Sequence, residues 1–407
     1  MRSAGTLENA RLAWQHRLLE ELARGSDLLC LEVLGTQFTV CWGAAVTWQQ
    51  RDAMRWAWAR CVDGGGPFLP PLPPEPTTDQ PFTASVTCQS KKYDDGTFQL
   101  QAASLEELAE HLTSRLTVAA ILANAGGLTM LHACGVADPA TGAVVALVAK
   151  SGTGKTTAAS LLAEAYGYVT DETVAIRSDG SVVPYPKPLS VKQRPGTPKR
   201  QVGPDELGLL PAPAMPFLQS IVLLNRVPGG RPAAPKLQRV PLADAVLALI
   251  PDSSSQAEMV EPLQSLCRLI DRVGGVWQVT YTEAADLPAA LEPLFRMQPG
   301  DTSEWEAPAA EAARFRHIPE GYIRRAAPRD AVAIGGDLLL MLENQVVRLS
   351  GIGPAIWEAS ASPVTPDQLA EEVGNVHGTP EGYRDAVAAA TEQLIAKSVL
   401  AQGRTQI

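Results

Sequence analysis

AVVALVAKSGTGKTTAASLLAEAYGYVTDETVAI, residues 143–176, is the stretch around which the rest of the chain is organised. Its apolar run from Val144 to Val148 predicts a β-strand that is buried on both faces. A turn containing two glycines follows, and residues 158–165 then have the composition of a helix. The order of strand, glycine-rich loop and helix is typical of a loop that binds phosphate groups.

The loop carries the residue types that phosphate binding needs, which are Ser151, Gly152, Thr153, Gly154, Lys155, Thr156 and Thr157. The glycines let consecutive backbone N–H groups face phosphate oxygens, and the helix N-terminus adds partial positive charge. Lys155 is placed to reach the β- and γ-phosphates, and the Thr156 hydroxyl suits Mg²⁺. Ala149 stands where the strict pattern has glycine. A chance Gly-Lys-Thr is the alternative, but the flanking strand and helix favour nucleotide binding.

An acidic pair, Asp171 and Glu172, precedes the next predicted strand at residues 173–176. One carboxylate of such a pair accepts the proton of an attacking hydroxyl, and the other holds or orients Mg²⁺. A solvated surface turn is the alternative, since acidic pairs are common on surfaces. His132, in a strand predicted at residues 130–136, lies one hairpin before the loop; a structural histidine is the alternative to a catalytic one.

Length and composition limit the remaining choices. A chain of 407 residues predicts two to three domains. The net charge of −10 argues against broad binding to nucleic acid or anionic membranes. The six cysteines show no CxxC spacing and the five histidines no cluster, so reduced core cysteines are expected and a zinc site is not. The sequence shows neither a signal peptide nor a long apolar segment, which predicts a cytoplasmic protein.

The rest of the chain shows patterns of ordinary secondary structure. Residues 182–200 form a basic, proline-rich segment, which either covers bound phosphates and contacts the substrate or is a solvated loop. The other predictions are helices at 7–22, 47–61 and 104–125, a hairpin at 27–42, a proline-rich connector at 64–81, and, after a polar linker, strands at 331–334, 337–342 and 346–349 followed by helices near 354–360, 366–374 and 380–397.

Residues 131–176 resemble the core of the HPr kinase family and its relatives, through a histidine-bearing strand, the SGxGK[ST] loop and an acidic pair that opens the next strand. The resemblance extends weakly from about residue 27 to about residue 294. It implies an α/β P-loop kinase core of the HPr kinase/phosphoenolpyruvate carboxykinase type, which uses ATP and Mg²⁺ to phosphorylate a serine hydroxyl of a protein. By motif, Lys155 and Thr156 hold phosphates and Mg²⁺, Asp171 is the base, Glu172 is the second acidic residue on the metal, and His132 lies beside the site.

Two departures from the family bear on the substrate. The bifunctional HPr enzymes have glutamate directly after the loop hydroxyl, where this chain has Thr157. Their later segment for phosphorolysis is not recognisable in this sequence. Both departures argue against HPr as the substrate and against the reverse dephosphorylation reaction.

Residues 320–402 resemble the PqqD family through GGDLLLMLENQVVRLSGIGPAIWEA, TPDQLAEEV and the long last helix. That resemblance implies a small winged-helix-like α+β module, which binds the leader of a ribosomally made precursor peptide as an added strand. The implied binding residues are Val346, Val347, Arg348, Leu349, Val387, Ala390 and Leu394, with ordinary core positions as the alternative.

Together these patterns predict four segments: an N-terminal α/β subdomain with its connector (1–80), the kinase core (81–298), a linker (299–319) and the leader-binding module (320–407). The predicted function is an ATP- and Mg²⁺-dependent peptide kinase of natural-product biosynthesis, with lasso peptides as the favoured class. Its partner would be the leader-core precursor, with no nucleic acid and no membrane; a homo-oligomer is left open. The alternatives are a non-catalytic, ATP-gated peptide chaperone and a small-molecule kinase.

Overall fold

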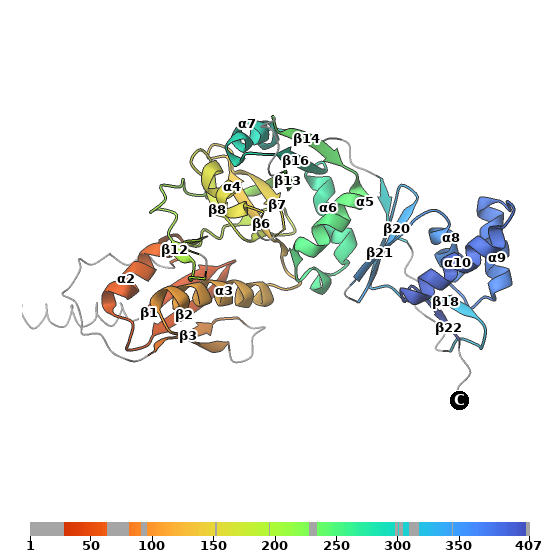
Figure 1. Ribbon diagram of the computed structural model, residues 1–407, viewed down its shortest axis with the longest axis horizontal. Coiled ribbons are helices and arrows are strands. Elements are labelled where there is room, and N and C mark those ends of the chain that lie inside the picture. Colours follow the sequence, from red (N-terminus) through yellow and green to blue (C-terminus); the bar gives the residue numbers. More distant parts are fainter. Residues whose placement is uncertain are drawn as a thin grey trace, which may run out of the picture. The chain divides into compact units, whose positions relative to one another are not determined.

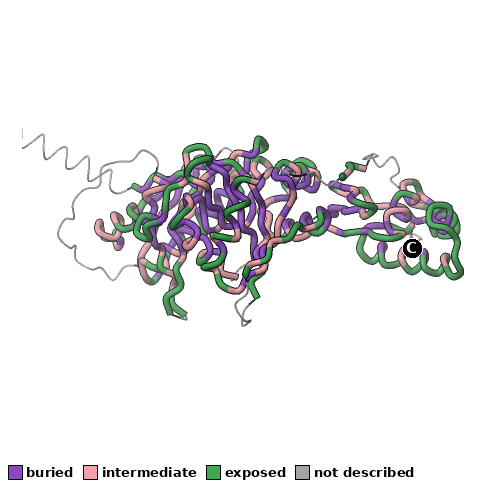
Figure 2. Tube along the Cα trace, turned by 90° about the horizontal axis from the view of Figure 1, so that it is seen from above, coloured by how far each residue is buried: buried purple, intermediate pink, exposed green. Residues whose placement is uncertain are grey.

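The computed structural model describes residues 28–62, 81–90, 96–150, 153–194, 196–227, 234–297, 300, 304–308, 317–343 and 345–403. The helix predicted at residues 7–22 and nearly all of the proline-rich connector lie outside them. The chain divides into two compact units, the first comprising Met1–Leu237 with Val279–Met297 and the second Gln238–Gln278 with Gln298–Ile407. Each unit has its own buried interior (Figure 2).

The first unit begins with an antiparallel sheet in the order β1-β2-β3-β4. The predicted hairpin is confirmed: β1 and β2 are joined at Leu34 and Gly35, both with positive φ. That conformation matches the twist of a tight hairpin, and glycine adopts it at little cost. The strands are β1 (Leu28–Val33), β2 (Thr36–Trp42), β3 (Phe82–Cys88) and β4 (Thr97–Ala102).

Two helices accompany this sheet, as predicted. α2 (Trp48–Ala57) starts at a capping box built by Thr47 and Gln50. α3 (Leu105–Ala123) starts at Ser104, whose hydroxyl accepts from the backbone N–H of Glu107. The Glu107 carboxylate accepts from the backbone N–H of Ala103, one residue earlier than a capping box requires. The apolar side of α3 packs onto the sheet and shares its core.

The phosphate loop belongs to a six-stranded mixed sheet in the order β14-β16-β13-β7-β6-β8 (Figure 1). β6 and β7 form an antiparallel hairpin, whereas β13 runs parallel to β7 on its other side. The boundary between the two units passes through β14 and β16. The strands are β6 (Ala133–Ala137), β7 (Ala143–Val148), β8 (Gly167–Thr170), β13 (Phe217–Arg226), β14 (Lys236–Val240) and β16 (Val276–Tyr281). The protein is therefore a mixed α/β protein.

The single strand predicted at residues 130–136 is wrong. β5 (Thr129–Leu131) ends before His132, and β6 begins after it in a different sheet. Leu131 pairs with Val174, whereas Ala133 pairs with Val148. The chain therefore changes sheets at His132, and β5 pairs with β9 (Val174–Ile176), which in turn pairs with β10 (Val182–Val183).

The second unit contains a sheet in the order β17-β19-β20-β21. One face, with Leu338, Leu340 and Leu342 on β20, shares a core with the C-terminal helices. On the opposite face Leu339 and Met341 are also buried, and α6 packs against β19. The strands are β17 (Trp305–Glu306), β19 (Asp330–Ile334), β20 (Asp337–Leu342) and β21 (Gln345–Leu349), and the helices are α5 (Leu242–Leu249), α6 (Pro262–Arg272), α8 (Gly353–Ala359), α9 (Pro366–His377) and α10 (Tyr383–Ala396).

The predicted order of three strands and three helices in the C-terminal module is confirmed. The sequence places residues 238–278 in the kinase core, but their contacts group them with this module. Within the predicted linker, Trp305 and Glu306 pair with β19. The remaining described elements include β11 (Leu189–Val191), β12 (Arg200–Val202), α7 (Leu287–Leu291), the ribbon of β18 (Ile323–Arg325) with β22 (Leu400–Gln402), and short 3₁₀ turns.

Candidate functional site

The phosphate loop runs from the end of β7 to the start of α4 (Lys155–Leu162). Gly154 caps the helix at a φ of +99°, a conformation that side chains disfavour, although no atom crowds its position. Lys155 is buried, and its ammonium group donates a hydrogen bond back across the loop to the Ala149 carbonyl. The predicted strand, loop and helix are therefore present; Ser151 and Gly152 themselves lie outside the described residues.

The three threonines of the loop have different surroundings. The Thr153 hydroxyl donates to the Lys150 carbonyl at 2.6 Å and closes the turn. Thr157 is exposed. The Thr156 hydroxyl donates to Asp171 Oδ2 at 3.1 Å, so the first turn of α4 meets the acidic pair that follows β8.

The acidic pair is not a solvated turn. The Asp171 side chain is 3% exposed, and that of Glu172 is 34% exposed. Asp171 Oδ1 also accepts a hydrogen bond from the Tyr168 hydroxyl at 3.1 Å. Burial and the neighbouring Asp171 charge raise the pKa of Tyr168 well above its usual value, so its hydroxyl remains a donor.

Lys187 is the residue of this site that the sequence does not single out. Its ammonium group lies 2.7 Å from Asp171 Oδ1 and 3.3 Å from Glu172 Oε2, and its side chain is 2% exposed. Burial alone lowers the pKa of Lys187, but the charges of Asp171 and Glu172 raise it more, and the net shift is upward. A buried, charged lysine therefore joins the two carboxylates.

The segment around Lys187 is extended and held on both sides. Prolines at 184, 186 and 188 restrict its backbone, and alternate residues Val183, Tyr185 and Lys187 point into the interior. The Tyr185 hydroxyl lies 2.8 Å from Thr117 Oγ1 on α3, in the core that α3 shares with the N-terminal sheet. This alternation of prolines with apolar residues around one lysine was the available sequence signal.

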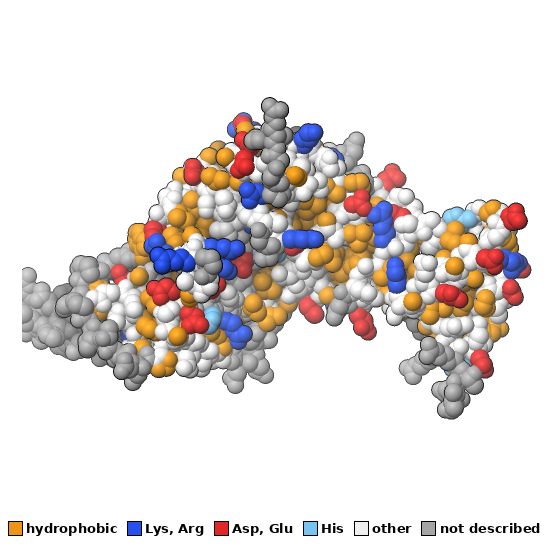
Figure 3. All heavy atoms as spheres, viewed as in Figure 1, with side chains coloured by type: hydrophobic (Ala, Val, Ile, Leu, Met, Phe, Trp, Pro, Cys, Tyr) orange, Lys and Arg blue, Asp and Glu red, His pale blue; other side chains and the backbone are white. Residues whose placement is uncertain are grey.

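The rest of the basic segment does not converge on the loop. Lys199 pairs with Glu110 at 3.3 Å, and Arg200 pairs with Glu206. Lys192 and Arg194 are exposed. On the face in Figure 3, basic side chains are interspersed with acidic ones. The segment is therefore divided into one buried lysine and several surface cations.

Strand pairing places the backbone of His132 near both the phosphate loop and the acidic pair. Its neighbours pair with Val148, the last residue of β7, and with Val174, two residues after Glu172. The side chain is half-buried. This register is compatible with the predicted place of His132 next to the loop.

The oxygen atoms at this site fit Mg²⁺. This ion takes oxygen ligands, commonly one or two carboxylates together with substrate phosphates. Thr156 and Asp171 offer a hydroxyl and a carboxylate only 3.1 Å apart, at the end of the loop where phosphates would lie. In the described part of the chain no group of three or more His, Cys, Asp or Glu side chains is arranged to hold a metal ion by itself. Thr156 and Asp171 could serve as ligands of Mg²⁺ beside the phosphates of a nucleotide.

The residues predicted to bind a leader peptide divide into two groups. Val347, Leu349, Val387 and Leu394 are buried in the core of the second unit, and Ala390 packs against that core. Val346 is half-buried and Arg348 is exposed. Arg348 pairs with Asp337 across the sheet and, at 2.6 Å, with Asp244 on α5. The side chains in the core are therefore not available as contacts, whereas β21 ends the sheet.

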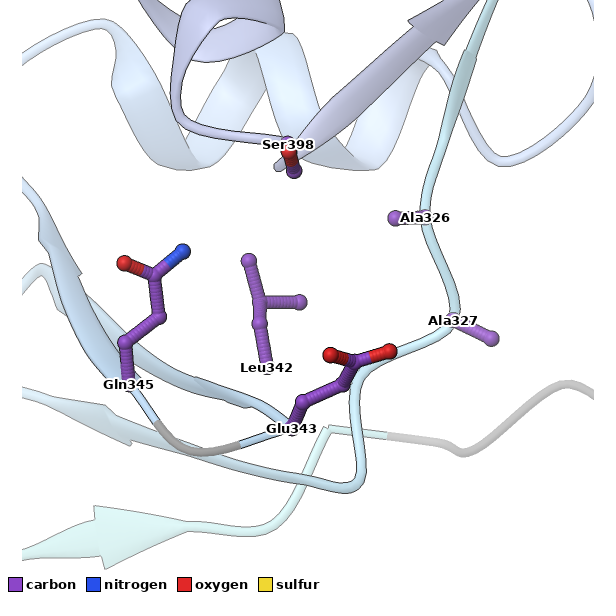
Figure 4. Close-up of a pocket in the computed structure, with 6 residues that line it drawn as sticks. All are labelled: Ala326, Ala327, Leu342, Glu343, Gln345 and Ser398. Atoms are coloured by element: carbon purple, nitrogen blue, oxygen red, sulfur yellow. The ribbon is translucent and has the colours of Figure 1, made fainter.

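A pocket of about 490 Å³ opens at the start of β21. Figure 4 shows the side chains of Leu342, Glu343, Gln345, Ala326, Ala327 and Ser398 around this hollow. Ser398 follows α10, so the pocket connects the start of β21 with the end of the last helix. Its lining combines an apolar base with one carboxylate and two neutral polar groups.

Comparisons with known proteins add little beyond this geometry. No family model matches the sequence, and no curated protein matches it. Thirteen chains of solved structures match. One is the Hpr(Ser) kinase/phosphatase from Coxiella burnetii, with 12% identity, coverage of 41% of this chain and 93% of that chain, and a TM-score of 0.20. A likeness this weak says nothing about activity.

The helices of the described residues include no candidate for a membrane span. None of them combines the length and the apolar character that crossing a bilayer requires.

Proposed function

We propose that this protein is an ATP- and Mg²⁺-dependent kinase that phosphorylates a side-chain hydroxyl, serine by preference, of a ribosomally made precursor peptide. The observation that carries the proposal is the 3.1 Å hydrogen bond from Thr156 to Asp171. It joins the first turn after a phosphate loop to a buried carboxylate, and Lys155 occupies the adjacent position. Phosphoryl transfer depends mainly on such positioning and on charge stabilisation.

The contacts favour a reversal of the roles that the family resemblance implies for the two carboxylates. Tyr168 and Lys187 hold Oδ1 of Asp171, and Oδ2 faces Thr156 on the side of the loop, where an ion bound to the phosphates would lie. Glu172 is more exposed and can face an incoming hydroxyl. In this proposal Asp171 and Thr156 would hold Mg²⁺, which would supply positive charge beside the phosphates, and Glu172 accepts the proton.

The substrate oxygen forms a bond to the γ-phosphorus, and the bond from that phosphorus to the β–γ bridging oxygen breaks, which releases ADP. The hydroxyl proton passes to Glu172. Lys155 stays near the β- and γ-phosphates and stabilises their charge.

Recognition of the precursor is proposed for the second unit. A leader segment would add to β21, which pairs with β20 and ends its sheet among the described strands. A side chain of that segment would enter the pocket at the start of β21, where Glu343 favours a basic group. Binding of the leader would raise the local concentration of the core peptide at the kinase.

The test of transfer uses the full chain with ATP, Mg²⁺ and the precursor peptide encoded beside it. We expect a mass gain of one phosphoryl group on the peptide, lost in Lys155→Ala. Glu172→Gln should keep nucleotide affinity but lose at least about 10²-fold in transfer rate, the scale of general base catalysis. Nucleotide binding without any phosphopeptide would favour the ATP-gated chaperone, and transfer only to small alcohols would favour the small-molecule kinase.

The test of leader binding uses fluorescence anisotropy with a labelled synthetic leader. Figure 4 shows the Ala326 side chain pointing into the hollow, so Ala326→Trp should fill the pocket and weaken binding at least about tenfold, the loss of one anchoring side chain. Ala401→Trp, at an exposed position on β22 of the same unit, is the matched control. Equal affinity of the two variants would contradict the proposed site.

A further inference from the structure

Lys187 occupies a position that a metal ion takes in many phosphoryl-transfer sites. Paired carboxylates commonly bridge two divalent ions, one on each side of the reacting phosphate. Here the ammonium group of Lys187 bridges the pair, 2.7 Å from Asp171 Oδ1 and 3.3 Å from Glu172 Oε2. The other oxygen of Asp171 faces Thr156. Asp171 therefore separates two cation positions, one of which is already filled.

This ammonium group is held firmly in place. Lys187 Nζ also donates to the Pro188 carbonyl at 3.2 Å, and the Lys187 carbonyl accepts from the Tyr168 hydroxyl at 3.2 Å. The neighbouring prolines restrict the backbone, and the side chain is almost fully buried. The Asp171 side chain is equally deep, and leaving its carboxylate without a cation there would be costly.

We propose that Lys187 is a built-in substitute for a second divalent ion, so that the site takes one Mg²⁺ with each nucleotide. The inference rests on the proposed function and specifies its metal requirement. Lys187 acts as a positioning residue: it fixes Asp171 against Thr156 and leaves one position, on the Thr156 side, for the ion that enters with the phosphates.

The test counts bound ions directly. Mn²⁺ is titrated into the full chain in the presence of a non-hydrolysable ATP analogue, and free Mn²⁺ is followed by electron paramagnetic resonance. Wild-type protein should bind one Mn²⁺ per nucleotide, Lys187→Ala should bind two, and Lys187→Arg, which keeps the charge, should bind one. Lys236→Ala, at an exposed lysine of β14, is the matched control and should behave as wild type.

The Mg²⁺ dependence of transfer gives a second readout. The transfer rate of Lys187→Ala should be at least tenfold below wild type at low Mg²⁺ and should recover partly at high Mg²⁺. The apparent order of this rate in Mg²⁺ should rise from one in wild type towards two in the variant. A residue that merely stabilises the fold would lower the folded fraction without changing this order.

Several outcomes would overturn the inference. One such outcome is a wild-type protein that binds two Mn²⁺ per nucleotide. Another is a folded Lys187→Ala protein that binds one Mn²⁺ per nucleotide and whose transfer rate keeps the wild-type order in Mg²⁺. Should Lys187→Ala fail to fold, the wild-type count and Lys187→Arg decide the matter, since two ions in either contradict the proposal. Wild type that binds neither nucleotide nor Mn²⁺ would overturn the proposed function as well, which separates the two failures.

Discussion

Asp171 in the first unit and Asp330 in the second are the buried aspartates of the described chain, and they satisfy their carboxylates differently. Asp171 accepts from three side chains: those of Thr156, Tyr168 and Lys187. Asp330 accepts mainly from the start of α6: Oδ2 from the backbone N–H of Leu263 at 2.7 Å, and Oδ1 from the side-chain amide of Gln264 at 2.7 Å.

Under the proposed function, this difference separates a carboxylate of the active site from a structural one. α6 has no side-chain cap of its own, because Glu261 precedes it with a positive φ and makes no capping hydrogen bond. Asp330 supplies that cap from β19 and satisfies amides that would otherwise be unpaired. The Thr156 hydroxyl can turn from Asp171 to an arriving ligand, whereas the backbone amides that bind Asp330 cannot turn. Burial alone therefore does not identify a site; the kind of partner does.

Neutralising Asp171 is the most direct test of whether Asp171 and Asp330 have different roles, and it should have the largest effect. Asp171→Asn should lower the rate of transfer at least about 10²-fold, the scale of removing one preorganised electrostatic group, and should also weaken Mn²⁺ binding with the nucleotide. The measurements are initial rates on the precursor peptide and Mn²⁺ titration. Asp330→Asn is the matched control, and its rate per folded molecule should stay close to wild type. Comparable rate losses in the two variants would remove the distinction.

The second prediction concerns stability. Asp330→Ala leaves the first amides of α6 and the Gln264 side chain without this acceptor, which should destabilise the second unit by about 2–3 kcal/mol. Denaturant unfolding followed by tryptophan fluorescence measures the change, since Trp305 and Trp357 lie in this unit. Nucleotide affinity of the folded fraction should not change. A stability equal to wild type would show that α6 does not depend on the Asp330 cap.

The sequence predicts the parts of the site whose signals are local. The strand before the loop, the helix after it, the acidic pair and the hairpin at residues 27–42 each depend on patterns within a few residues. The change of sheets at His132 has no such signal, because the apolar run around it is continuous. A strand that leaves one sheet for another is specified by its partners, which lie elsewhere in the chain.

The contacts of Lys187 and Asp330 could not be predicted for the same reason, because their partners lie farther away in the sequence. Lys187 lies in a segment rich in lysine and arginine; the prolines and apolar residues around it indicate a buried, extended segment, but nothing nearby indicates that its partner is Asp171. Asp330 lies directly before a predicted strand, but its hydrogen-bond partners Leu263 and Gln264 lie 67 and 66 residues earlier. The sequence for that reason places residues 238–278 in the kinase core, whereas their contacts group them with the C-terminal module, where α6 packs against β19. Deletion of residues 320–407 would consequently uncover α6.

The smallest effect is expected at a third, surface aspartate, which serves as a reference for the two buried ones. Asp337 opens β20, and hydrogen bonds from Ser350 and then from Arg348 hold its pKa below the ordinary value of 3.8. A carboxyl whose pKa is lower in the folded than in the unfolded state stabilises the fold above the unfolded pKa, and this contribution disappears as pH falls through the folded pKa. Because the group faces solvent, screening keeps the effect small.

Asp337→Asn should therefore be slightly less stable than wild type near neutral pH and equal to it in strong acid, as measured by denaturant unfolding at several pH values. Ser350→Ala, which removes the hydrogen bond with the largest effect on this pKa, should show part of the same dependence. A stability difference that persists in strong acid would mean that packing, and not the charge of Asp337, accounts for it.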